Sequence, residues 1–566
     1  MDSTSTERSS STNTIDKKKK FKRYWNELRS RSLNVPTVLL LIYSATIPLS
    51  HKTLNNIIPG FVGRNECENS NYIEDPLTIN SLNVLSVSSL FLLIPFCGWL
   101  SDTKIGRGNA VYLSLWVGWL GSLLQALACC LQYYESCDRI TVIGRYTLSS
   151  LAGIFLIISL AFMYTNILPY GIDQMMHLSS VKIRSFIHWL VWVYFFFDTI
   201  PLNIIFSFAN YKTFVLINAV VACALFSLSL CLQFHLKHRF EHIPIPNPYK
   251  TVFKVLKSSL KRNRNKLQRR SAFTYWGKEP SRIDLAKERY GGPFSHEQVE
   301  NVKTFLRILA VLAATFGFFI VFNSFVSAIS ASLPLQNGNN GLQGHAHYEI
   351  WFIAYGALLA LIPVCELLIL PLFPKFEYFL MNPLRGIGLA NVLLTISIIS
   401  LFLINLIGRH VSSSFTIEDR SDDSVPYWIL LIPTVLAGTS LVILWLCSFE
   451  FLCSQAPFGM HGMIIGLFWF LYGAFNDIGT IILFLIYSFT YDSSKSFMSY
   501  TTITFGVIAL LGLVLYILVA RWYVKRVRDT DLNLRTVVEN NWEQQLIKKS
   551  SYNQNDEFTV ATDDEQ

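Results

Sequence analysis

Charged residues are scarce in this chain of 566 residues: Asp, Glu, Lys and Arg make up 15%, whereas apolar residues make up 52%. Soluble domains carry about 25% charged residues, and the mean hydropathy of +0.38 points the same way. This composition excludes an ordinary soluble domain. We predict an all-α membrane protein that crosses the bilayer many times, because helices satisfy their own backbone hydrogen bonds in lipid.

The sequence also lacks the motifs of common enzymes and ATP-driven pumps. It has no Walker loop and no nucleophile elbow, and no pair of its ten cysteines has metal-ligand spacing. We therefore expect no enzymatic activity, no cofactor and no metal. Cys67 and Cys137 are predicted to lie in outward-facing loops, where a disulfide between them and two free thiols are the alternatives.

About twelve apolar stretches are long enough to cross the hydrocarbon core, which takes about 20 residues. They comprise residues 36–58, 82–100, 110–131, 148–170, 187–208 and 213–232, then 305–330, 350–373, 386–407, 426–451, 463–489 and 501–523. Two sets of six suggest two similar bundles with a solute pathway between them. The predicted parts are an N-terminal tail (1–35), a six-helix bundle (36–232), a basic linker (233–304), a second six-helix bundle (305–523) and a C-terminal tail (524–566).

The connections between these stretches differ in charge. Basic residues gather on one side, among them Lys104, Arg107, Lys182, Arg184 and Arg521, and acidic residues on the other, among them Glu66, Glu68, Glu135, Glu418 and Asp422. Because basic loops stay in the cytoplasm, we predict cytoplasmic termini, a cytoplasmic linker and no signal peptide. The linker suits anionic lipid better than nucleic acid. A plasma membrane and an endolysosomal membrane both remain open.

Two local patterns predict features of the backbone. Pro48 lies inside the first apolar stretch and should kink or interrupt that helix. Before the seventh stretch, Ser295 can cap a helix and Gln298 can reach back to it. Val299 and Val302 then follow at helical spacing, so an amphipathic helix should lead into the seventh span.

Glu450 stands in an almost unbroken apolar stretch. A carboxylate at bilayer depth opposes insertion by roughly 2.5 to 3.5 kcal/mol, so it usually faces a water-filled cavity or a partner. At a cavity it would accept charge-assisted hydrogen bonds from a solute ammonium. The alternative is that Glu450 lies close to the cytoplasmic end and reaches interfacial water.

Other ionisable residues also fall at membrane depth. Asp198, Asp477 and His51 are the candidates for proton coupling, and Glu366 and His188 are further groups of this kind. The alternative for the two Asp residues is hydrogen bonding between helices. For His51 the alternative is an interfacial position beside a snorkelling Lys52.

The segment from Gly98 to Arg107 resembles the signature loop of the major facilitator superfamily. Its glycines, Gly98 and Gly106, permit close helix approach and a tight turn. Asp102 can pair with Arg107 or accept from the amino end of a neighbouring helix. We expect this loop to be part of a gate.

Three further segments narrow the resemblance. They are Asn166 with Gly171, Asp173 and Gln174; Ser281 to Glu288 with Gly291 to Phe294; and Glu450 to Pro457 with Met460, Trp469, Gly473 and Asn476. Together they are similar to the proton-coupled oligopeptide transporters, the solute carrier 15 family, and most of all to its animal peptide/histidine branch. The resemblance implies a major facilitator fold and a symporter of small peptides or histidine that works by alternating access and is driven by protons.

The family also implies site residues, from which this chain partly departs. The family's Glu on the tenth span, which helps to hold the peptide amino group, corresponds to Glu450. Its first-span motif of two Glu and one Arg is replaced by Tyr43, Thr46 and Ile47, and its fourth-span cation by Tyr164. The predicted solute-contacting residues are Glu450, Asn166, Tyr164, Tyr43, Asn323, Trp469 and Asn476.

A peptide carboxylate would lose its usual partners at such a site, and an unpaired buried charge is costly. Two alternatives to a peptide carrier therefore remain open. One is a divergent carrier of another organic solute without proton coupling, and the other is a membrane scaffold or sensor that transports weakly. The expected partners are a small peptide or amino acid, protons and membrane lipids, but no nucleic acid.

Overall fold

The computed structural model describes residues 26, 29, 31–62, 90–133, 139–175, 180–208, 211–241, 249–261, 281–331, 356, 359–373, 382–414, 431–457, 459–489 and 494–523. Within these ranges every regular element is a helix, so the predicted all-helical fold is confirmed. Cys67 and Cys137 lie outside the described residues, and their disulfide stays a prediction.

Eight described helical stretches are long and apolar enough to cross a membrane. They belong to α5 (Arg107–Tyr133), α6 (Arg139–Asp173), α8 (Tyr211–Leu236), α11 (His296–Ala314) with α12 (Phe316–Ala331), α16 (Pro383–Ser414), α17 (Leu431–Gln455), α18 (His461–Phe489) and α19 (Ser494–Trp522). Other predicted spans contain α2 (Val35–Ser44), α3 (Thr46–Val62), α7 (Ser180–Phe208), and helical residues 90–100 and 359–372. The multi-pass membrane fold is supported, while the count of twelve spans stays a prediction.

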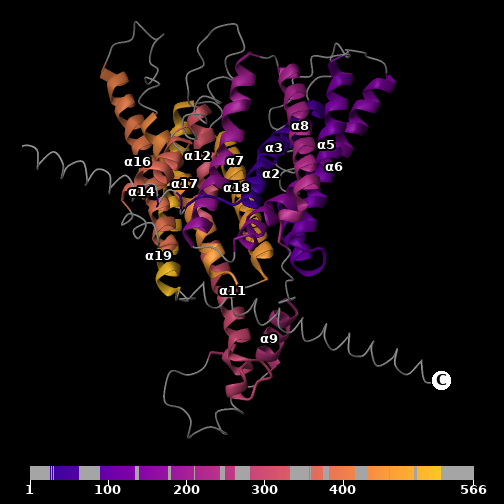
Figure 1. Cartoon of the computed structure of the whole chain (residues 1–566). Coiled ribbons are helices and arrows are strands. Elements are labelled where there is room, and N and C mark those ends of the chain that lie inside the picture. Colours follow the sequence, from indigo (N-terminus) through magenta and orange to yellow (C-terminus); the bar gives the residue numbers. More distant parts are fainter. Residues whose placement is uncertain are drawn as a thin grey trace, which may run out of the picture.

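The helices form two groups that correspond to the two halves of the chain (Figure 1). In the first half α5 packs against α6 and α8, and in the second half α16 packs against α17 and α19. Helices α7 and α18 lie between the groups, where α7 contacts α17 and α18 contacts α6. These two contacts join one half to the other.

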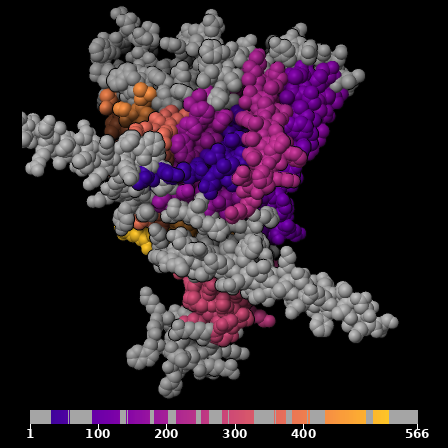
Figure 2. All heavy atoms as spheres, in the orientation of Figure 1, coloured from indigo at the N-terminus to yellow at the C-terminus, as the bar shows by residue number. Residues whose placement is uncertain are grey.

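The outer surface of the bundle is apolar. Helix α8 lies on the face shown in Figure 2, and its Val220, Leu228 and Phe234 are exposed. Apolar side chains on the outside of a helical bundle suit contact with lipid.

The first predicted span is interrupted, as its proline indicates. Helix α2 ends at Ser44, Ala45 forms a turn, and α3 begins at Thr46. The ring of Pro48 conflicts with the carbonyl of the residue four positions earlier, Ser44, and Pro48 has no N–H to donate. The break therefore falls one turn before the proline.

The predicted capping box and amphipathic helix are both confirmed. The Ser295 hydroxyl accepts from the Gln298 N–H at 3.3 Å, and the Gln298 side chain accepts from the Ser295 N–H at 3.3 Å. Helix α11 begins at the next residue and extends below the bundle, where α9 (Tyr249–Lys261) packs along it (Figure 1). Val299 and Val302 are buried in a small core that joins α11 to the linker.

Ion pairs fasten the linker to α11. Lys287 and Lys303 each contact both Asp284 and Glu300. Burial by itself raises the pKa of Asp284, but hydrogen bonds from Lys287, Lys303 and Ser281 outweigh it and hold this pKa below its usual range. A lowered carboxyl pKa contributes stability above the ordinary value of about 3.9 and loses it only as the pH falls further. The linker contact is therefore complete at neutral pH.

Gly98 allows helix 90–100 to approach the start of α18. A Cβ atom on Gly98 would lie 2.5 Å from the carbonyl oxygen of Gly462 and 3.1 Å from the Cα of Met463. Both neighbours are backbone atoms, which cannot rotate away as a side chain can. The close approach of the two halves at this point therefore requires glycine.

We predict that Gly98→Ala destabilises the protein by about 1 to 3 kcal/mol, the usual cost of overpacking. The measurement is thermal unfolding of the purified full-length protein in detergent. Gly144→Ala is the matched control, since a Cβ there meets nothing within 4 Å. Equal midpoints for the two variants would contradict the argument.

Candidate functional site

A small cavity lies between the two halves. It has a volume of about 30 Å³, which holds about two water molecules. Its lining residues are Ser44, Ile47, Tyr164, Ile167, Leu168, Leu190, Val191, Tyr194, Trp445, Phe449, Ile465 and Trp469. Among the described residues that line it there is no Asp, Glu, Lys, Arg or His, so the wall is apolar and aromatic.

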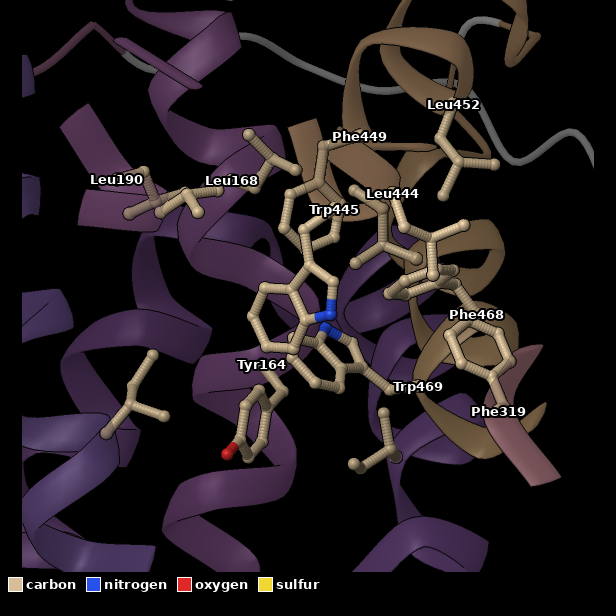
Figure 3. Close-up of a cluster of buried hydrophobic side chains, with 14 of the residues drawn as sticks. Tyr164, Leu168, Leu190, Phe319, Leu444, Trp445, Phe449, Leu452, Phe468 and Trp469 are labelled. Atoms are coloured by element: carbon tan, nitrogen blue, oxygen red, sulfur yellow. The ribbon is translucent and has the colours of Figure 1, made fainter. Parts of the chain in front are cut away.

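Four of the lining residues form an aromatic box, which we define as Tyr164, Tyr194, Trp445 and Trp469. The ring centroids of Tyr164 and Trp469 are 4.4 Å apart, those of Trp469 and Trp445 are 5.0 Å apart, and those of Trp445 and Tyr194 are 5.3 Å apart. A 6.5 Å contact between the two tyrosine rings closes the circle, and their hydroxyl oxygens lie 3.3 Å apart. Figure 3 shows the rings of Tyr164, Trp445 and Trp469 gathered between the helices that carry them.

Of the predicted solute-contacting residues, Tyr164 and Trp469 line the cavity. Asn323 instead donates to Asn476 at 2.7 Å and to Tyr472 at 3.2 Å. The Tyr472 ring lies 5.7 Å from the Trp469 ring. Asn323 and Asn476 therefore lie next to the box, on the side of Trp469, and do not line the cavity.

The other two predicted positions make local or peripheral contacts. Asn166 donates to the Phe162 carbonyl and to the Thr165 hydroxyl, both at 2.8 Å. The Tyr43 hydroxyl donates to Gln233 on α8 at 3.0 Å. Neither residue is among those that line the cavity.

Glu450 has a partner from the other half. Its Oε1 accepts from Nε of Arg184 at 2.9 Å and lies 2.8 Å from Nη2 of the same guanidinium. Arg184, which the sequence assigned to a loop, lies near the start of α7 and is 8% exposed. Glu450 lies five residues before the end of α17, about 7.5 Å along the axis. The pair therefore joins the halves near the end of the bundle that bears the linker.

A second acidic group joins the same two halves. Glu366 lies in the π-helix η5 (Cys365–Ile369) and is 2% exposed. It accepts from the Ser185 hydroxyl at 3.1 Å, contacts Nδ1 of His188, and lies 3.6 Å from Nη1 of Arg31. A π-helical turn often marks a functional position. Two acids of the second half, the partly buried Glu450 and the buried Glu366, thus meet Arg184, Ser185 and His188 on the first turns of α7.

The three predicted proton-coupling residues lie elsewhere. Asp198 is 3.9 Å from Lys52 and follows His188 by ten residues of α7, about 15 Å. The Nε2 atom of His51 is buried without a hydrogen-bond partner. Asp477 is half-buried beside Asn476 on α18. These groups do not belong to the set of contacts that Glu366 makes with Ser185, His188 and Arg31.

In the predicted gate loop, from Gly98 to Arg107, Asp102 and Arg107 form an ion pair. Nε of Arg107 donates to Asp102 at 3.0 Å, and the backbone N–H of Met463, in the first turn of α18, donates to Asp102 at 3.1 Å. Both expected roles of Asp102 are thus met at once, and Gly106 makes the turn at φ +84°. Arg107 also donates to Asp173 at 2.8 Å.

The linker contributes a third donor, which the sequence did not predict. The Tyr249 hydroxyl at the start of α9 donates to Asp102 at 2.8 Å. Burial and the neighbouring Asp102 carboxylate both raise the pKa of Tyr249, so its hydroxyl keeps the proton that it donates. The linker is therefore bonded directly to the predicted gate loop.

We predict that Tyr249→Phe loosens α9, because a hydrogen bond to a charged group contributes about 1.5 to 3 kcal/mol. Hydrogen exchange of residues 249–261 should quicken about tenfold or more. Tyr112→Phe is the control, since Tyr112 is exposed on α5. Unchanged exchange in Tyr249→Phe would contradict a role for this bond.

The sequence overlooked several residues of this region. By sequence, Arg31 falls in the predicted N-terminal tail and Arg184 in a predicted cytoplasmic loop. Tyr194 and Trp445 fall in predicted spans, where nothing distinguishes them from their apolar neighbours. Only Glu366 and His188 gave a signal, as ionisable residues at membrane depth. Tyr194 and Trp445 gave no signal, because their contacts join helices that are distant in the sequence.

Comparison with known proteins gives matches in sequence. Residues 196–503, more than half of the chain, match the POT family, PTR2. Solute carrier family 15 member 5 of Homo sapiens is 26% identical over 312 residues, or 53% of this chain and 50% of that protein. This alignment thus spans about half the length of that relative. Solute carrier family 15 member 3 of Rattus norvegicus is 22% identical over 472 residues, or 71% of this chain and 78% of that protein.

Solved structures share the fold. The POT family transporter PepTSo superposes with a TM-score of 0.58 at 16% identity, over 87% of this chain and 99% of that one. The proton:xylose symporter XylE of the major facilitator superfamily gives 0.52 at 11% identity, over 84% and 94% of the two chains. The predicted major facilitator fold is therefore confirmed.

Proposed function

Because the chain belongs to the POT family, a family of membrane transporters, we propose that it is a secondary active carrier of small organic solutes that works by alternating access. The observation that carries this proposal is two acids that meet the other half across the interface: the partly buried Glu450, held by Arg184, and the buried Glu366, held by His188 and Arg31. Opening that end of the bundle separates these charges. Leaving one partner of a buried pair uncompensated costs about 3 to 5 kcal/mol.

The separated acids need new positive partners, and transport can supply them. A solute ammonium replaces Arg184 at Glu450, and a proton neutralises Glu366. Closure at one end then depends on what is bound, which is the requirement for alternating access. One proton that crosses about 100 mV supplies roughly 2.3 kcal/mol, enough for about fifty-fold accumulation of solute.

The first candidate solutes are small peptides and histidine, the class that the family implies. Glu450 supports this candidate, because a desolvated ammonium needs a charged acceptor. A second candidate is an organic solute without a free carboxylate. It is favoured by Ile47 and Tyr164, which stand where the family carries cations, and by the uncharged cavity wall that both of them line.

The membrane and its orientation belong to the same proposal. The Arg184–Glu450 end of the bundle, the linker and both termini would be cytoplasmic, in the plasma membrane or an endolysosomal membrane. Lys250, Lys254 and Lys257 are exposed on α9, and anionic lipid headgroups are their expected partners.

We predict that Glu450→Gln weakens solute binding by about ten-fold or more, the contribution of a charged hydrogen bond. A thermal-shift screen of di- and tripeptides and histidine on the purified protein identifies the ligand on which to measure this. Arg184→Gln is the control: it breaks the same ion pair but leaves the acceptor, so binding should persist.

The outcomes separate the alternatives. Equal loss in both variants would reduce Glu450 to a structural role. Unchanged solute binding in Glu450→Gln, together with retained binding of cytoplasmic partner proteins, would favour a scaffold or sensor over a carrier.

We predict that Glu366→Gln abolishes uptake driven by an imposed pH gradient in proteoliposomes but preserves counterflow exchange. Gln cannot take up the proton, yet it still accepts from Ser185 and His188. The comparison variants are Asp198→Asn and Asp477→Asn. If Asp198→Asn or Asp477→Asn loses uptake driven by the pH gradient while Glu366→Gln keeps it, the coupling site is the mutated Asp and not Glu366.

A further inference from the structure

The aromatic box takes two rings from each half of the protein. Tyr164 and Tyr194 come from α6 and α7, while Trp445 and Trp469 come from α17 and α18. The contacts between Tyr164 and Trp469 and between Tyr194 and Trp445 therefore cross the interface. When the halves move apart, the box opens and its ring faces become available to a solute larger than the present cavity admits.

Ring faces are negative and attract cations. An ammonium that is desolvated against several aromatic faces gains about 0.5 to 2 kcal/mol from each good contact, and Trp is the best partner. The box offers four rings, with Phe449 close by at 5.8 Å from the Trp445 ring. A cation can therefore be held here although no acidic side chain lines the described wall.

The same wall disfavours a carboxylate. None of the lining residues carries a positive charge. A carboxylate brought into the box would lose its water and find no cation there, and a neutral donor such as the Trp445 N–H offsets only part of that penalty. The chemistry thus separates an amine from an amino acid.

Trp445 adds a requirement for an acceptor. Its Nε1 is buried and has no hydrogen-bond partner, and the residue is 3% exposed while lining the cavity. A buried indole N–H usually has a partner. A neutral oxygen on the solute would satisfy it.

We propose that this box is the binding site for apolar or aromatic amines that carry a neutral carbonyl or hydroxyl in place of a free carboxylate. The inference rests on the proposed function and specifies its solute. The ammonium lies against the ring faces, the oxygen accepts from Trp445, and Ile167, Leu168 and Ile465 hold the hydrocarbon part. Glu450, five residues along α17 from Trp445 and about 7.5 Å away along the axis, is the next acceptor for the ammonium as the halves part.

Four probes remove one feature at a time: phenylalaninamide has all of them, phenethylamine lacks the oxygen, hydrocinnamide lacks the ammonium, and phenylalanine replaces the amide with a carboxylate. Binding is measured by titration calorimetry on the full-length protein. Phenylalaninamide should bind most tightly, with phenylalanine weaker by about tenfold or more. Equal affinity for phenylalaninamide and phenylalanine, or for phenylalaninamide and hydrocinnamide, would overturn the proposal.

Two variants test the residues. Trp445→Phe keeps a ring and removes the donor, so it should erase the advantage of phenylalaninamide over phenethylamine, about three- to tenfold. Trp469→Leu should weaken both amines about three- to thirtyfold and hydrocinnamide less. Trp116→Leu, on an exposed face of α5 at 47% exposure, is the control and should change nothing. Weakening of all four probes equally in Trp469→Leu would indicate a structural role only and would overturn the cation site.

Counterflow of radiolabelled phenylalaninamide in proteoliposomes separates this inference from the carrier function. If the four probes bind in the expected order but phenylalaninamide shows no counterflow, the proposed carrier function is refuted and the proposed amine site stands. Counterflow of a dipeptide without binding of phenylalaninamide would refute the site and leave the carrier.

Discussion

The structure depends on how two carboxylates of the second half, one buried and one partly buried, find partners in the first half. Glu450 and Glu366 both contact side chains from the first turns of α7, and Arg31 brings a cation to within 3.6 Å of Glu366. Burial makes an unpaired charge costly, most of all at Glu366, so these contacts stabilise the interface only while both partners stay in place.

The other interhalf contacts differ in chemistry. At the linker end, Asp102 accepts from the first turn of α18 and from Tyr249 of the linker, while Gly98 lets the backbones approach. Deeper in the bundle, the aromatic box joins the halves through ring contacts, which are individually weak and carry no charge. The resulting interface has polar bonds at one end and adaptable aromatic contacts at its centre, an arrangement that can open without exposing unpaired charges in the cavity itself.

The departures from the family's residues fit this division. Tyr43, in place of a charged first-span residue, is bonded to Gln233 within the first half and takes no part in the cavity wall. Tyr164, in place of a cation, has become one side of the aromatic box. The described cavity wall thus carries no charge, while charged side chains meet where α7 contacts its two acidic partners.

The sequence by itself determined the features that depend on local or compositional physics. Scarce charge and long apolar stretches predicted the helical membrane fold, Pro48 predicted the break in the first span, and Ser295 with Gln298 predicted the start of α11. The pairing of Asp102 with Arg107 followed from their separation of five residues. Each of these depends on residues that lie near one another along the chain.

Only the tertiary structure decided which buried charges and rings meet. Arg184 and Glu450 are 266 positions apart, and nothing in either neighbourhood indicates the other. The same holds for Tyr164 with Trp469, and for Glu366 with His188. A buried charge shows from sequence that it needs a partner, because desolvation is costly wherever it occurs, but the packing of α7 against the second half determines which residue that partner is.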